Sequence, residues 1–206
     1  MVPGIASLRP TLCCWDTIDA RGEPNHCGIA AFCNDDRAYI GRIMGERSQH
    51  LTEKQIEEAL KQIPDRDIYP ELRNQDLRVA PEDLSANIFI KRPSLHDYYF
   101  FRGDDGRGLL QLRDMLLDEA RALEIISQDP HPNIVPYHGC RVRRGYIIGI
   151  VFEKLSGYTL WRLLEDGLGD IELIPFMEAL RSAVGHLHTL GLSHNDICPQ
   201  NIIMEG

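Results

Sequence analysis

The residues of this chain whose order could support chemistry stand in the stretch "HNDICPQN", from His194 to Asn201. Its carboxylate, Asp196, precedes the amide of Asn201 in the order H-x-D-x-x-x-x-N. Phosphoryl transfer needs a carboxylate beside the acceptor hydroxyl and an oxygen ligand for a magnesium ion. A loop of this length lets Asp196 face the acceptor while Asn201 reaches Mg²⁺, and Pro199 stiffens the loop between them. The stretch therefore predicts a loop of the phosphotransferase kind.

A helix is expected to lead directly into this loop. The stretch "IPFMEALRSAVGHLHTLG", residues 174–191, carries Pro175 in its first turn and ends at Gly191, as helices commonly do. Its apolar residues recur at helical spacing and predict one buried stripe. The stripe consists of Phe176, Leu180, Ala183, Val184 and Leu187.

The remaining pattern divides the chain into a strand-rich first part and a helical second part. Two strands are expected in residues 28–44, around the turn Asn34–Asp36, and a helix with a Thr52–Gln55 capping box is expected to run to Pro64. Further elements are expected as a strand at 85–93, a long helix at 109–126, a strand at 144–155 entered by a turn at Arg144 and Gly145, and a short helix at 159–167. This segregation predicts the α+β class with two lobes rather than a doubly wound sheet.

Composition narrows the function classes. The chain has 206 residues and a net charge of −9 with its acids spread along it, which argues against a nucleic-acid-binding protein, since such a protein would show a basic face. No apolar signal segment is visible near Met1, and the most apolar run, "GYIIGIVF", is too short to cross a bilayer. We therefore expect a cytoplasmic protein with no membrane partner. Its six cysteines are expected to be reduced thiols. A zinc site is the alternative, built from Cys13, Cys14, Cys27 and Cys33 with His26.

Residues 85–206 resemble a eukaryotic protein kinase domain. The resemblance rests on "EARALEIISQDPHPNIVPYHGC", "YIIGIVFEKLSGYTLWRLL" and "LRSAVGHLHTLGLSHNDICPQN", which arrive in kinase order and at kinase spacing. The details "HND" and "YHGC" are similar to divergent kinase-like proteins of filamentous fungi. The resemblance implies a small β-rich N-lobe with one long helix and an incomplete helical C-lobe. The implied division is an N-terminal extension at 1–84, the N-lobe and hinge at 85–158, and a partial C-lobe at 159–206.

By position, the resemblance gives Lys91 the role of the lysine that holds the α- and β-phosphates of ATP. It gives Glu119, on the long helix, the role of the ion-pair partner of that lysine. Glu124 remains the alternative partner, because "SQDP" is a small insertion that blurs the register.

The resemblance also implies the rest of a nucleotide site. Phe152 takes the gatekeeper position, and the backbone of Glu153 and Leu155 forms the hinge that binds adenine. Asp196 is implied as the catalytic base and Asn201 as a ligand of Mg²⁺. The cofactors implied are ATP and Mg²⁺, and the partner is a protein substrate or a binding protein.

Four departures from the family pattern bear on activity. No Gly-rich phosphate loop precedes Lys91, and the "GDDGRG" of residues 103–108 follows the lysine strand and is expected to be a flexible connection. Cys198 stands where these kinases usually carry a lysine, and Asn195 replaces their usual arginine. The sequence stops before any D-F-G, so we expect a domain truncated after the catalytic loop that binds Mg-ATP weakly or not at all.

Three functions follow from these observations. The first is a protein kinase-like phosphotransferase that acts on protein hydroxyl groups. The second is a pseudokinase, a binding or regulatory module without transfer activity. The third is a small-molecule kinase of the aminoglycoside or choline type, whose loops share H-x-D-x-x-x-x-N. "HPNIV" and the order of Lys91 and Glu119 favour the protein-kinase branch.

Overall fold

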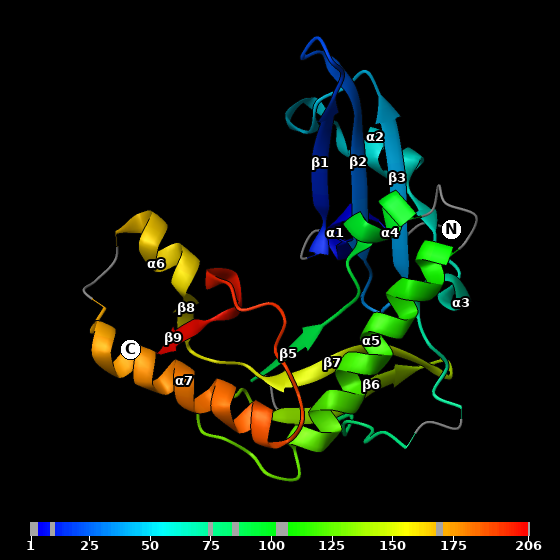
Figure 1. The fold of residues 1–206 in the computed structure, drawn as a ribbon. Coiled ribbons are helices and arrows are strands. Elements are labelled where there is room, and N and C mark those ends of the chain that lie inside the picture. The colour runs from blue at the N-terminus through cyan, green and yellow to red at the C-terminus, as the bar shows by residue number, and fades with distance from the viewer. Residues whose placement is uncertain are drawn as a thin grey trace. The chain divides into compact units, whose positions relative to one another are not determined.

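The computed structural model describes residues 4–8, 11–73, 76–83, 87–101, 107–167 and 171–205. Its elements are shown in Figure 1. In chain order they are α1 (Ile5–Leu8), β1 (Cys13–Ile18), β2 (Pro24–Phe32), β3 (Ala38–Met44), η2 (Ser48–His50), α2 (Glu53–Ala59), β4 (Lys61–Gln62), α3 (Asp65–Ile68), β5 (Ile88–Lys91), α4 (Leu95–Phe101), α5 (Arg107–Ile126), β6 (Tyr137–Arg143), β7 (Tyr146–Glu153), β8 (Gly157–Thr159), α6 (Leu160–Asp166), α7 (Leu173–Thr189), η3 (Pro199–Asn201) and β9 (Ile203–Glu205). The mixture of antiparallel sheets and helices confirms the α+β class and is compatible with a kinase-like fold.

The chain forms two compact units, each assembled from three stretches. Unit 1 comprises Met1–Arg73, Arg92–Leu117 and Val142–Ile148. Unit 2 comprises Asn74–Lys91, Asp118–Arg141 and Gly149–Gly206. Contact between stretches that are remote in sequence defines both units. The predicted division at 84/85 and 158/159 stays a prediction.

Unit 1 is built on the antiparallel sheet β1–β2–β3–β4. The predicted hairpin is present as β2 and β3, which pair from His26↔Met44 to Phe32↔Ala38. Its turn contains no glycine, and Asp36 instead takes a positive φ of 63°. Aspartate tolerates this left-handed conformation better than most side chains, so the sequence can turn here without glycine.

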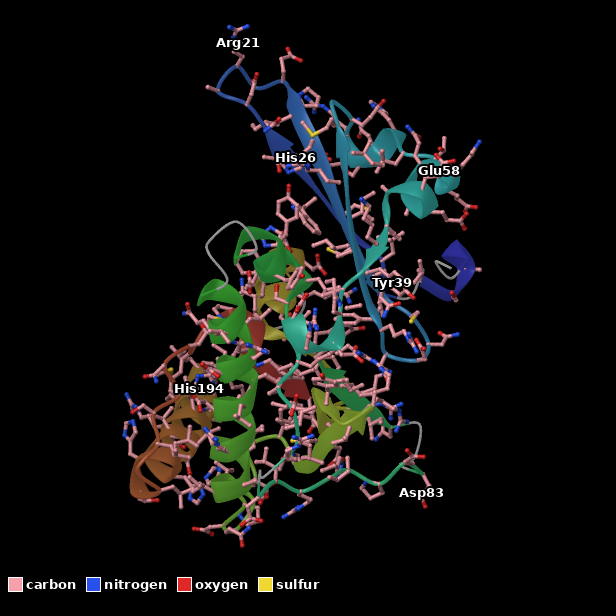
Figure 2. All side chains as sticks on the ribbon, turned by 90° about the vertical axis from the view of Figure 1, so that its right-hand side faces the viewer. Arg21, His26, Tyr39, Glu58, Asp83 and His194 are labelled. Carbon is pink, nitrogen blue, oxygen red and sulfur yellow. The ribbon has the colours of Figure 1, made fainter. Side chains whose placement is uncertain are left out.

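Both faces of this sheet are covered by apolar side chains. One face contributes Ala30 and Ile40 to a cluster with Tyr69 and Leu95, whereas the other buries Cys27 and Ile29. Figure 2 labels His26 and Tyr39, which lie on neighbouring strands of this sheet. Unit 1 therefore has a hydrophobic core of its own.

The predicted capping box begins α2. The Thr52 hydroxyl accepts a hydrogen bond from the backbone N–H of Gln55, and the Gln55 side chain accepts one from the backbone N–H of Thr52. The prediction that this helix continues to Pro64 is wrong, because α2 ends at Ala59. The two residues after Leu60 pair with β3 as β4, so sheet pairing replaces the last helical turn.

A second sheet has the order β5–β7–β6. The most apolar run of the sequence is its central strand, β7, in which every residue from Ile147 to Phe152 is buried. At the predicted turn between β6 and β7, Arg144 and Gly145 both have positive φ. At Gly149, an added Cβ would lie 2.6 Å from the Lys91 carbonyl oxygen, so a glycine lets β5 approach β7 closely.

The last third of the chain is mostly helical. α6 begins with a Thr159 cap and ends at Gly167 in the left-handed conformation, while α7 is followed by Gly191 with a φ of 74°. Of the predicted stripe of α7, Ala183 and Leu187 are buried, whereas Phe176, Leu180 and Val184 are only half-buried. β8 and β9 then pair in antiparallel fashion (Figure 1).

The remaining expectations concern the loop at residues 103–108, the six cysteines and membrane-spanning segments. Of the expected loop at residues 103–108, Arg107 and Gly108 belong to α5, and the rest lies outside the described residues. All six cysteines are free, and in the described part of the chain no group of three or more His, Cys, Asp or Glu side chains could hold a metal ion. Among the helices that the structure describes, none is long and apolar enough to cross a membrane.

Candidate functional site

Strand β5 and helix α5 bring Lys91 and Glu119 together. The Nζ atom of Lys91 lies 2.6 Å from Oε1 of Glu119, although 28 residues separate them in sequence. Alternation in β5 points Lys91 away from the half-buried Ile90, and Ala120, beside Glu119, is fully buried against the core. The two side chains are 51% and 34% exposed. A half-exposed ion pair contributes only about 0–1 kcal/mol to stability, so the pair is better suited to orienting the ammonium group than to holding the fold together.

Glu124, the alternative partner of Lys91, is used elsewhere. Its Oε1 accepts hydrogen bonds from the backbone N–H of Arg78 at 2.7 Å and from the Tyr137 hydroxyl at 2.9 Å. Burial and the neighbouring Cys140 and Glu124 raise the pKa of Tyr137, so its hydroxyl keeps the proton that it donates. Of the two glutamates, the structure places Glu119 at Lys91.

The predicted hinge begins at the end of β7, whose last residue is Glu153. Phe152 is buried and packs its ring against Tyr137, with ring centroids 6.4 Å apart. The backbone N–H of Glu153 donates to the Pro136 carbonyl at 3.0 Å, and that of Lys154 donates to Asn87 at 3.2 Å. Leu155 is half-buried. These bonds fix the path of the chain as it leaves the sheet.

One residue of this region was not identified from the sequence. Phe89 lies directly opposite Phe152 in the β5–β7 pair, and it shares the strand face of Lys91 because the two are separated by one residue. Its side chain is 55% exposed. The signal was available in the alternation of "NIFIK", which places an aromatic ring beside the lysine on a polar face.

The predicted catalytic loop holds Asp196 and Asn201 in contact. Nδ2 of Asn201 donates to the carboxylate Oδ2 of Asp196 at 2.8 Å and to the Asp196 carbonyl at 3.0 Å. Because Nδ2 is directed at Asp196, Oδ1 of Asn201 is the oxygen that can face a metal ion. Both residues are exposed. Asn195 has a φ of 59°, a left-handed conformation that asparagine adopts more readily than most residues.

Helix α7, which leads into this loop, is tied to the segment that follows α5. Nε2 of His186 donates to the Asp129 carbonyl at 2.7 Å, and the Asn133 amide donates to the Ala179 carbonyl at 3.2 Å. The rings of His131 and His186 stack with centroids 5.1 Å apart, and His131 Nε2 lies 2.9 Å from the Ser182 hydroxyl. His186 thus has a structural role, in holding α7 to this segment.

The far end of the loop is held by backbone pairing. The backbone N–H of Leu160, at the start of α6, donates to the Ile202 carbonyl at 2.8 Å, and Asn201 N–H donates to Cys198 at 3.0 Å. All the predicted site residues belong to unit 2. The structure thus brings together Lys91 with Glu119, and Asp196 with Asn201, while their chemical roles stay predictions.

Three features of this site are parts of a protein kinase-like domain. They are a strand lysine paired with a helix glutamate, a segment that leaves the sheet after a buried phenylalanine, and an H-x-D loop that follows a helix. Sequence comparison supports a divergent protein kinase-like domain. The chain is 32% identical over 103 residues to the MAP kinase kinase kinase SSK2 of Saccharomyces cerevisiae, a match covering 49% of this chain and 6% of that protein.

Two other relatives extend the similarity. The sensor for unfolded proteins in the ER, ire1, of Schizosaccharomyces pombe is 28% identical over 173 residues, which are 77% of this chain and 16% of that protein. Death-associated protein kinase 2 of Mus musculus is 30% identical over 86 residues, or 41% of this chain and 23% of that protein. The chain thus spans less than a quarter of the length of each of these relatives. No protein-family model matches the chain, and no solved structure matches it.

Proposed function

We propose that unit 2 binds Mg-ATP and transfers the γ-phosphoryl group to a hydroxyl group of a protein. The observation that carries this proposal is the 2.6 Å ion pair between Lys91 and Glu119. An ammonium group held at this position by a carboxylate is the arrangement with which protein kinases contact nucleotide phosphates. The relatives with kinase names favour a protein acceptor over a small molecule.

Each residue has a part in this reaction. Lys91 contacts the α- and β-phosphates, and Glu119 keeps its ammonium group in place. The backbone of Glu153 and Leu155 binds the base. Asp196 accepts the proton of the acceptor hydroxyl while the hydroxyl oxygen attacks the γ-phosphorus. The bond between the γ-phosphorus and the β–γ bridging oxygen breaks at the same time, and ADP is released.

The residues present also fit a magnesium ion. Mg²⁺ prefers oxygen ligands and is commonly held by one or two carboxylates together with substrate phosphates. The amide Oδ1 of Asn201 would supply an oxygen of this kind, with the nucleotide phosphates as further ligands. When bound, the ion would neutralise charge that develops on the phosphoryl oxygens.

A second candidate is a nucleotide-binding or regulatory module that transfers no phosphate. The observation that favours it is the position of β5, which lies at the edge of the order β5–β7–β6. In the part of the chain that the structure describes, no strand pairs with β5 on its other side to carry a Gly-rich turn over the phosphates. Cys198 also leaves the loop without the cation that would stabilise charge in the transition state.

Thermal unfolding with Mg-ATP tests the binding site itself. We expect weak binding, so that about 10 mM Mg-ATP raises the unfolding midpoint while the Lys91→Ala variant shows no such rise. Lys61→Ala is the matched control, because Lys61 is an exposed lysine of β4 in unit 1 and should leave the rise unchanged. An absent rise in the wild-type protein, or an equal rise in Lys91→Ala, would refute the proposal.

A further inference from the structure

A short segment ahead of β5 packs on the outer strand of the second sheet. We call residues 76–83 the strap; Figure 2 labels its last residue, Asp83. Val79 pairs with Cys140 of β6 in parallel orientation, Cys140 N–H donates to the Arg78 carbonyl at 2.7 Å, and Ala80 N–H donates to the Cys140 carbonyl at 2.9 Å. The strap is therefore joined to the sheet by backbone hydrogen bonds on both sides of Val79.

The fit between the strap and β6 requires a glycine. Gly139 has a φ of 127°, and a Cβ added there would lie 2.7 Å from the backbone nitrogen of Ala80. Real Cβ atoms do not approach a backbone atom so closely, and only glycine adopts this φ readily. Ala80 itself is 9% exposed. The strap is thus a packed part of unit 2 rather than a loose connection.

The strap also contacts α5, through Glu124. The carboxylate Oε1 of Glu124 accepts from the Arg78 backbone N–H at 2.7 Å and from the Tyr137 hydroxyl at 2.9 Å. The Arg78 guanidinium reaches one turn further along the chain, to the Ser127 hydroxyl at 3.2 Å. One carboxylate thereby joins the helix, the strap and β6.

Glu124 and Glu119 hold different sides of α5. At 3.6 residues per turn, five residues rotate the side-chain direction by about 140°. Glu119 points to Lys91 of β5, whereas Glu124 points to the strap and to Tyr137. A half-exposed ion pair is a weak constraint on the rotation of a helix. Contacts on a second side of the helix are therefore needed to keep Glu119 directed at Lys91.

We propose that Glu124 is a positioning residue, which fixes the rotation of α5 against the strap and β6 so that Glu119 meets Lys91. The catalytic meaning of this role rests on the proposed function, because Lys91 and Glu119 matter for transfer only if they hold nucleotide phosphates. The structural role does not depend on it. A change in the strap would then alter the nucleotide site without touching it.

The reactivity of the Lys91 amine tests this role directly. An amine-acylating reagent modifies a paired ammonium more slowly than a free one, and mass spectrometry reports the modification of each lysine. Lys154, an exposed lysine of the same unit, serves as the internal reference. We expect Glu124→Ala to raise the acylation rate of Lys91 relative to Lys154 by about two- to fivefold, the range that corresponds to losing an exposed ion pair.

The matched variants separate positioning from general destabilisation. Glu124→Gln keeps Oε1 as an acceptor and should return the Lys91 rate close to the wild-type value. Asp118→Ala removes an exposed carboxylate of the same helix that pairs with Arg121, and it should change nothing. Glu119→Ala sets the rate of the unpaired amine. A Glu124→Ala protein that folds and labels Lys91 at the wild-type rate would overturn the proposal.

If Glu124→Ala does not fold, the Tyr137→Phe variant tests the positioning role of Glu124 instead. It keeps the buried ring and removes only the hydroxyl that donates to Glu124, so it should raise the Lys91 rate by a smaller amount. No rise would overturn the proposal. Because the labelling needs no nucleotide, its outcome is independent of the thermal test with Mg-ATP. A protein that never binds Mg-ATP contradicts the proposed function, whereas unchanged labelling contradicts the role of Glu124.

Discussion

Asp196 and Asn201 show how a local bond can arrange two different chemical tasks. Nδ2 of Asn201 donates a hydrogen bond to Oδ2 of Asp196. This bond orients the carboxylate and leaves the amide oxygen, Oδ1, as the atom that can face a metal ion. The exposed position of both residues allows an acceptor hydroxyl to reach them. A base acts on that hydroxyl, whereas nucleotide affinity depends on the hinge and on the phosphate contacts of Lys91.

These separate tasks lead to a prediction for Asp196→Asn. The variant should lose phosphoryl transfer by about a hundredfold or more, because asparagine cannot accept the proton, while its Mg-ATP affinity should stay within about twofold. Transfer to a mixture of serine- and threonine-containing peptides is measured beside thermal shifts. Equal losses of affinity and turnover would contradict the role of base. Transfer that is absent in the wild-type protein, with binding retained, would favour the non-catalytic module.

At the scale of elements, sequence pattern predicted best where neighbouring residues decide the structure. The capping box of Thr52 and the turn at Arg144 depend on contacts within a few residues, and both are present. The end of α2 was wrong because the competing pairing of Lys61 with Ile40 is a tertiary contact. The strap could not be anticipated for the same reason, since its parallel bridge from Val79 to Cys140 leaves no periodic signal in so short a segment.

The same difference between local and long-range contacts applies to the candidate site. The sequence predicted one loop that holds both Asp196 and Asn201, but the hydrogen bond between them was not predicted. The pairing of Lys91 with Glu119 spans 28 residues, and only the resemblance to kinases suggested it. The resemblance favoured Glu119, but the insertion "SQDP" blurs the register and kept Glu124 as the alternative. The structure separates them through Tyr137 and Arg78, which surround Glu124.

The stability of unit 1 is expected to depend on pH through His26, which lies where β2 packs against α4. His26 of β2 is buried, with its Nε2 atom 2.7 Å from the Tyr99 hydroxyl and 3.2 Å from Thr17. Burial, assisted by the positive charge of Arg42, lowers the pKa of His26 below its usual 6.5. The folded state therefore prefers the neutral ring. Below pH 6.5 the unfolded chain binds a proton that the folded chain still resists, so stability falls as the pH decreases toward the lower folded pKa.

We therefore expect the free energy of unfolding to decrease between about pH 7.5 and about pH 5.5, and the decrease to be smaller in His26→Gln. Chemical denaturation at several pH values measures it. The comparison isolates His26 because the other histidines are common to both proteins. The carboxylates with a lowered pKa, Asp16 and Asp35, titrate below this interval. A pH dependence that is identical in the two proteins would show that His26 does not carry it.

For the molecule as a whole, the division into two units separates the candidate site from most of the N-terminal sequence. Lys91, Glu119, Glu153, Asp196 and Asn201 all belong to unit 2. The large apolar clusters around Ile40 and Ile29 belong to unit 1. Each unit gathers stretches that are remote in sequence. A ligand of the proposed site should therefore act on one unit more than on the other.

Hydrogen exchange measured by mass spectrometry tests this expectation for the intact chain. Mg-ATP at about 10 mM should slow exchange in peptides from α7 and from residues 149–155, because a ligand that binds only the folded site lowers the population of openings that destroy it. Peptides from β2 and β3 should exchange at an unchanged rate, since their openings leave Lys91 and Glu153 in place. Lys91→Ala should abolish the effect in unit 2. Equal slowing in both units would contradict a nucleotide site confined to unit 2, and slowing that persists in Lys91→Ala would place the nucleotide elsewhere on the chain.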